Sequence, residues 1–185
     1  MITPEDLQRL FLTRQSTRLY DSTKPVEREK LMRCIEAARI APSACNAQPW
    51  RFIVIDNPEL KNKVADCTSS RVLAINHYTK QAPIHVAIVR EKGNLNSIVG
   101  QVLKDKEYPM FDIGIAAIQF CLQATSEGLG TCIMGWFKEK EIKKLLNIPR
   151  GKRLELIITL GYPASADIRP KIRKETGEML SYNSY

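Results

Sequence analysis

The segment from Asp112 to Ser126 limits the possible folds more than any other part of the chain. Its apolar side chains recur at three- and four-residue spacing, and Gly128 follows directly after it. This pattern predicts a helix that Asp112 caps and Gly128 ends, with apolar residues around much of its circumference. One small sheet could hardly cover such a cylinder on all sides. The segment therefore predicts burial against a second subunit.

Caps and periodicities predict the remaining elements. Helices are expected over 4–12, over 26–41, from 58 onward and over 138–144, because polar caps, prolines or a solvated charge pattern mark them. Strands are expected over 50–55, 82–89 and 154–160, with a short apolar segment at 132–136. Helices and strands do not alternate in a strict βαβ rhythm. The order predicts an α+β fold in a single domain covering residues 1–185.

Composition excludes several classes of protein. None of the apolar stretches among the 185 residues reaches the roughly 20 apolar residues that a membrane span needs. The acidic start of the chain resembles no secretory signal, so a cytoplasmic protein is expected. The five cysteines are widely spaced, which predicts small buried residues rather than disulfides or a zinc site. Trp50 and Trp136 are likewise expected in the core.

The formal net charge of +8 is compatible with nucleic acid, an acidic membrane surface or a phosphorylated small molecule as partner, and the positions of the basic residues decide among them. Most basic residues are dispersed or interleaved with acids, so nucleic acid is not expected as a partner. The segments 14–18 and 171–174 differ, because their bases lie in non-periodic stretches beside Ser16 and Pro170. Paired bases with a hydroxyl suit a phosphate group.

Missing motifs narrow the chemistry further. The chain has no P-loop, no HExxH and no GxSxG, while Gly128-Leu129-Gly130 follows a helix and is interpreted as a helix stop. With two histidines and no evident pair of facing carboxylates, an enzyme of this sequence would rely on a cofactor.

Five segments, in order, resemble the FMN-dependent nitroreductase family. They are Arg14-Gln15-Ser16-Thr17-Arg18, the stretch from Ala41 to Trp50 (APSACNAQPW), Asn76, Gly128-Leu129-Gly130 with Ile133-Met134-Gly135-Trp136, and Pro170-Lys171-Ile172-Arg173. The resemblance implies the nitroreductase-like fold, a central and mainly antiparallel sheet flanked by helices. It also implies an interwoven homodimer with FMN at the interface and residues 174–185 as a C-terminal arm around the partner.

The same resemblance implies a role for each segment in FMN binding. Basic and hydroxyl groups would bind the phosphate, carboxamides would match the pyrimidine edge, and backbone N–H groups would reach flavin N5. Arg18 is the candidate cation near N1 and O2. The full set of expected FMN-binding residues is Arg14, Gln15, Ser16, Arg18, Pro42, Ser43, Ala44, Asn46, Gln48, Asn76, Met134, Gly135, Lys171 and Arg173. No side chain is expected to be catalytic, and no metal is expected.

The implied activity is ping-pong reduction, in which NADH or NADPH supplies reducing equivalents to an electron-poor small molecule such as a nitroaromatic or a quinone. A flavin-binding sensor or carrier without NAD(P)H turnover remains the alternative, and a basic nucleic-acid module is a third hypothesis. The short stretch between Arg90 and Asp112 is expected to form a small lid over an open pocket.

Overall fold

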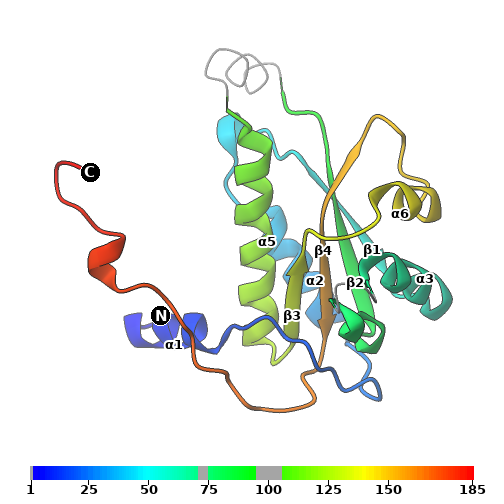
Figure 1. Ribbon diagram of the computed structural model, residues 1–185, viewed down its shortest axis with the longest axis horizontal. Helices are drawn as coiled ribbons and strands as arrows, with labels where there is room; N and C mark the ends of the chain where they lie inside the picture. Colours follow the sequence, from blue (N-terminus) through cyan, green and yellow to red (C-terminus); the bar gives the residue numbers. More distant parts are fainter. Residues whose placement is uncertain (1, 71–74, 95–105) are drawn as a thin grey trace.

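The computed structural model describes residues 2–70, 75–94 and 106–185, and it places helices on both faces of a four-stranded sheet (Figure 1). The helices are α1 (Pro4–Thr13), α2 (Arg28–Arg39), α3 (Pro58–Thr68), α5 (Tyr108–Ser126) and α6 (Glu139–Leu145), with short 3₁₀ turns η1 (Ala44–Asn46), η2 (His77–Gln81) and η3 (Thr176–Glu178). The strands are β1 (Trp50–Ile55), β2 (Ile84–Arg90), β3 (Gly130–Met134) and β4 (Arg153–Gly161). The expected α+β class is confirmed.

The sheet has the strand order β1-β2-β4-β3, and every pairing is antiparallel. This confirms the expected central antiparallel sheet. The register between β2 and β4 shifts at Ile88/Val89, where a bulge interrupts the ladder. Residues 132–134 of the apolar segment expected at 132–136 belong to β3, which forms the edge of the sheet beside β4, while Gly135 and Trp136 follow its end.

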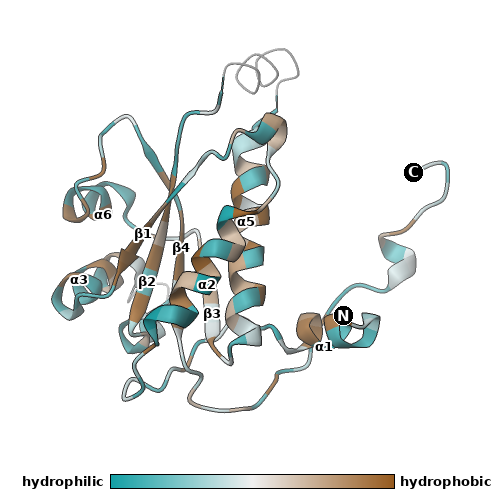
Figure 2. Ribbon diagram, turned by 180° about the vertical axis from the view of Figure 1, so that it is seen from behind, coloured by the Kyte–Doolittle hydropathy of each residue, from teal (hydrophilic) through white to brown (hydrophobic). Residues whose placement is uncertain are grey.

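Two apolar clusters fix the layers. On one face of the sheet, α2 and α5 pack against alternate residues of β2 and β4, among them Val86 and Ile158, which are fully buried. On the opposite face, α3 and α6 pack against Ala87 and Ile157. Successive side chains of a strand point to opposite faces, so both sets of residues must be apolar in a sheet that is covered on both faces. Figures 1 and 2 show α5 running the length of the sheet.

Helix α5 differs from its prediction at its start. It begins at Tyr108 with Pro109 in the first turn, so Asp112 lies inside the helix and does not cap it. The prediction was wrong because a proline in the first turn is a better start signal than the later aspartate. The C-terminal end is confirmed, since Gly128 has a φ of 76° and Leu129 N–H bonds to the Ala124 carbonyl.

Burial corrects two further expectations. Trp50 is buried as expected, but Trp136 is 58% exposed, because it follows the end of β3 in a loop that this chain leaves uncovered. Cys34, Cys121 and Cys132 are buried, whereas Cys45 is exposed and Cys67 is half-buried. All five are free thiols, in agreement with the absence of a disulfide framework.

Both ends of the chain leave the body of the structure. Helix α1 has no buried residue, and the segment after Pro163 runs away from the sheet on the side of α5 (Figure 1). Figure 2 shows apolar residues, in brown, along α1 and α5. Apolar side chains are exposed on α1, α5 and the C-terminal segment; they include Leu7, Phe11, Leu12, Met110, Phe111, Ile115, Ile118, Ile172 and Met179. Such surfaces mark contact sites.

Among the described residues, none of the helices combines the length and apolarity required to cross a bilayer. The expected lid lies largely in residues 95–105, outside the described residues, and the prediction stays untested.

Candidate functional site

The first motif segment lies directly on the edge strand β3. Thr17 N–H donates to the Thr131 carbonyl at 2.8 Å, and Ser16 forms a parallel bridge with Thr131. Gly130 permits this approach, because a Cβ built there would lie 2.4 Å from Thr17 Oγ1. Gly130 therefore has a packing role, whereas Gly128 ends the helix.

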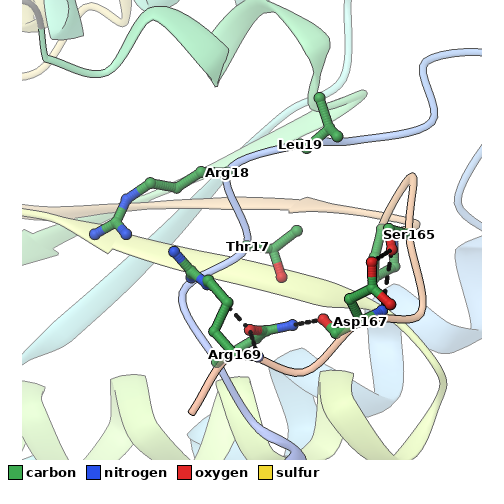
Figure 3. A pocket seen from close by; sticks show the side chains of 8 residues that line it. Thr17, Arg18, Leu19, Ser165, Asp167 and Arg169 are labelled. Carbon is green, nitrogen blue, oxygen red and sulfur yellow. Dashed lines mark hydrogen bonds between the residues drawn. The ribbon is translucent and has the colours of Figure 1, made fainter. Parts of the chain in front are cut away.

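The segment after β4 crosses the same motif from the other end of the chain. Gln15 Nε2 donates to the Asp167 carbonyl at 2.8 Å, and its Oε1 accepts from Arg169 N–H at 3.2 Å. Arg169 also hydrogen-bonds the Ser16 carbonyl. Figure 3 shows the hollow between the two segments, with Ser165 and Asp167 bonded to each other and Arg18 directed away from them. Gln15 thus has a structural role, linking residues about 150 positions apart.

A basic pocket of about 230 Å³ forms where the two segments meet. Lys171 Nζ donates to the Arg14 carbonyl at 2.8 Å, which fixes the lysine beside the N-terminal motif. Burial lowers the pKa of Lys171, and the charges of Arg14, Arg173 and Arg169 lower it further. The lining contains no acidic side chain; it consists of Arg14, Gln15, Ser16, Arg18, Arg169, Pro170, Lys171 and Arg173. Crowded positive charge without a counter-ion suits a phosphate.

Asn76 lies immediately before η2. Its backbone is left-handed, with a φ of 57°, and its Nδ2 donates to the Thr68 carbonyl at 3.1 Å. The Tyr78 hydroxyl lies 3.4 Å from Asn76 Oδ1 and 3.0 Å from Cys132 Sγ. Met134 is buried at the end of β3, while Gly135 is exposed and has open space where a side chain would be. Tyr78 therefore connects the Asn76 amide to β3, and the backbone is open just after the end of that strand.

The loop from Ser43 to Gln48 is strained. Cys45, Asn46 and Gln48 have φ values of 52°, 52° and 46°, and none of them is glycine. Internal bonds support the loop, since Gln48 N–H donates to Ser43 Oγ and Gln48 Nε2 donates to Asn46 Oδ1. Pro42 is exposed immediately before the loop. Gln48 is thus a structural residue of the loop.

Asp112 connects this loop to the long helix. Its Oδ1 accepts from Ala44 N–H at 3.0 Å, although the aspartate is only 5% exposed. A buried carboxylate that binds a backbone N–H fixes the loop's position more firmly than an exposed one could. Sequence reasoning gave this residue a capping role and missed its role in the loop.

Within one chain, the expected residues form two separate groups. The loop 43–48 lies at the start of α5, whereas the basic pocket lies beyond its end, next to Gly130. A helix of 19 residues spans about 28 Å at 1.5 Å per residue. The structure therefore joins Arg14, Gln15, Ser16, Arg18, Lys171 and Arg173, and leaves the loop apart from them.

Two site residues were missed from the sequence. Arg169 precedes the Pro170-Lys171 motif and lines the pocket, and the density of bases from 169 to 174 was a signal for it. Tyr78 lies two residues after Asn76, and no local pattern distinguishes it from a core tyrosine.

Fold and pocket together define a class: an α+β protein with an antiparallel sheet and a basic anion pocket built from both ends of the chain. The chain belongs to the nitroreductase family, because the model of the Nitroreductase family matches residues 12–162. Family membership indicates an oxidoreductase.

Individual relatives cover nearly the whole chain. An FMN-dependent nitroreductase from Clostridium difficile R20291 is 26% identical, with a TM-score of 0.75 over 95% of this chain and 98% of its own. The oxygen-insensitive NADPH nitroreductase of Helicobacter pylori is 24% identical over 96% of this chain and 97% of its own length. The iodotyrosine deiodinase of Thermotoga neapolitana is 26% identical over 93% and 95%. Relatives of similar identity thus carry different names.

Proposed function

We propose that the protein is an FMN-dependent oxidoreductase that uses NADH or NADPH to reduce nitroaromatics, quinones or similar electron-poor acceptors. The observation that carries the proposal is the basic pocket, which is lined by Arg14, Arg18, Lys171 and Arg173 and contains no acidic side chain. Two relatives support it: one is named an FMN-dependent nitroreductase and the other an NADPH nitroreductase.

The residues present fit FMN. Lys171, with its lowered pKa and three neighbouring guanidinium groups, gains most from a phosphate of roughly two negative charges. Ser16 offers a hydroxyl beside the pocket. Arg18 continues from it toward Asn76, whose carboxamide suits the alternating donors and acceptors of a pyrimidine edge. The basic groups and the Asn76 amide thus follow one another as the phosphate and the ring do in FMN.

FMN, when bound, supplies the electron-transfer chemistry. The protein's part is binding, orientation and electrostatics. Arg14, Lys171 and Arg173 would bind the phosphate, and Arg18 would place a positive charge close to the ring. The backbone N–H groups of Met134 and Gly135 would lie near N5, and the absence of a side chain at Gly135 leaves space for close approach.

The proposal includes a homodimer in which the loop 43–48 of one chain completes the site of the other. The loop, with Pro42, Ser43, Ala44, Asn46 and Gln48, is separated from its own pocket by the length of α5. Helix α1 and the arm 174–185 bury almost nothing in their own chain, and exposed apolar residues line α5. A second copy would cover these surfaces.

The test is the visible absorption spectrum of the purified protein, before and after anaerobic NADH and then NADPH. A two-banded flavin spectrum that bleaches with either donor is expected. Failure to retain or take up FMN would contradict the cofactor proposal. Bound FMN that neither donor bleaches would instead favour the alternative, a flavin-binding sensor or carrier.

Point variants locate the cofactor. Arg14→Ala and Arg173→Ala should each weaken FMN binding by about 1.5–3 kcal/mol, the value of a charge-assisted contact. Arg150→Ala removes a base outside this pocket and is the matched control. Wild-type FMN affinity in both pocket variants would show that the phosphate lies elsewhere.

A further inference from the structure

Tyr78 occupies the junction between two residues that the proposed function assigns to the flavin. It lies in η2 with 9% of its surface exposed, and its hydroxyl is directed at Asn76 and Cys132. The distances are 3.4 Å to Asn76 Oδ1 and 3.0 Å to Cys132 Sγ. A buried phenol with one hydrogen and two neighbouring acceptors keeps its orientation through both.

Asn76 is held from both ends of its amide. Its Nδ2 donates to the Thr68 carbonyl at 3.1 Å, and its Oδ1 faces the Tyr78 hydroxyl. The Asn76 backbone is left-handed, and the orientation of its amide depends on the contacts of the side chain. The amide therefore has one rotamer fixed by two different elements, α3 and η2.

Arg18 acts on the same hydroxyl from the N-terminal motif. Burial raises the pKa of Tyr78, as does the contact with Cys132, and the charge and hydrogen bond of Arg18 oppose that increase. The phenol therefore remains protonated, and its oxygen lone pairs are available to the guanidinium. Arg18 is exposed, and this interaction with the Tyr78 hydroxyl links the N-terminal motif to η2.

We propose that Tyr78 is a positioning residue whose hydroxyl fixes Arg18 and Asn76 against the flavin ring and thereby sets the preference for reduced over oxidised flavin. The inference rests on the proposed function. It follows from the different demands of the two redox forms: the reduced, anionic ring needs a fixed cation, whereas the phosphate needs only the basic pocket. Loss of the hydroxyl should affect reduced FMN far more than oxidised FMN.

The experiment compares FMN-loaded wild type and Tyr78→Phe by reduction potential and by FMN dissociation constant. The midpoint potential of the variant should be lower by about 30 mV. For a two-electron couple this is a tenfold loss of preference for reduced over oxidised flavin. Oxidised FMN should bind within about threefold of wild type, because Arg14, Lys171 and Arg173 are unchanged. A purely structural role would change thermal stability without moving the potential.

Tyr20→Phe is the matched control. Tyr20 is also a buried tyrosine, 4% exposed, with its ring centroid 6.4 Å from that of Tyr78. Its hydroxyl bonds to Thr159 at 2.7 Å. Removing that hydroxyl also breaks a buried hydrogen bond, yet it should leave the potential at the wild-type value.

A double-mutant cycle tests whether Tyr78 acts through Arg18. In an Arg18→Ala background, Tyr78→Phe should lower the potential much less than in wild type. A full-sized decrease in that background, or a wild-type potential in Tyr78→Phe alone, would overturn the inference. If the wild-type protein binds no FMN, the proposed function itself fails, and the two failures are therefore distinguishable.

Discussion

Gly130→Ala tests how closely the packing of the fold is connected to the anion pocket. A Cβ at this position would lie 2.4 Å from Thr17 Oγ1 and 2.8 Å from both Thr17 Cβ and Cγ2. Ordinary contact begins at 3.4 Å, so Thr17 must move by about 1 Å. Thr17 is 6% exposed and lies between Ser16 and Arg18, which both line the pocket.

The magnitude follows from two separate costs. Overpacking of this kind costs about 1–3 kcal/mol of folding stability. A shift of about 1 Å would also stretch the 2.8 Å bond from Thr17 N–H to Thr131 beyond hydrogen-bonding distance. Displacing the adjacent motif removes at least one charge-assisted phosphate contact, worth about 1.5–3 kcal/mol, so FMN should bind at least tenfold more weakly.

Urea denaturation of the apoprotein and fluorescence titration with FMN measure the two costs separately. Gly151→Ala is the control, because a Cβ there meets no atom within 4 Å. Adding Thr17→Ala to Gly130→Ala removes two of the three clashing atoms and should restore part of both losses. A Gly130→Ala protein with the wild-type urea midpoint and the wild-type FMN affinity would refute the reasoning.

Substitutions at three further residues test other parts of the structure. Burial lowers the pKa of His85 from 6.5 to about 4, so between these pH values the unfolded state binds a proton that the folded state does not. The free energy of unfolding should therefore fall by about 3 kcal/mol as the pH decreases from 6.5 to 4. His85→Gln should flatten that part of a pH–denaturation curve. Asp112→Ala should weaken FMN binding and expose the loop around Ala44 to protease. Asp112→Asn keeps an oxygen acceptor and should retain most of the FMN affinity and of the protease resistance. Equal behaviour of the two variants would contradict the anchoring role. Phe111→Glu puts a charge on an apolar side chain that is 59% exposed, and light scattering should show a monomer with weakened FMN binding; an unchanged dimer would place the interface elsewhere.

Local sequence was sufficient for most of the elements. The proline and polar caps at Pro4 and Pro58 locate two helix starts, and the two-sided apolar run of β2 identifies a strand covered on both faces. The strand order was not accessible, because it depends on pairings such as that of β2 with β4, some 70 residues apart. No local pattern specifies a partner at that distance.

The lining of the basic pocket was predictable as a set of residues but not as a geometry. Motif spacing identified Arg14 and Lys171, because charge and hydroxyl groups outside periodic segments indicate a phosphate. The left-handed backbone at Cys45 was not visible, since no glycine marks it and a distant carboxylate, Asp112, supports the loop. Tyr78 was missed for a similar reason: its significance comes from Arg18 and Cys132, which lie far away in sequence.

The basic pocket also has a consequence for the order of events during synthesis. Arg14 and Ser16 leave the ribosome before Lys171 and Arg173, which follow more than 150 residues later. Until the later segment closes over the earlier one, the pocket has only part of its charge and lacks the bond from Lys171 to the Arg14 carbonyl. The nascent chain must therefore include the segment after β4 before the pocket has its full charge, and loading of the site reports that this segment has been made and is in place.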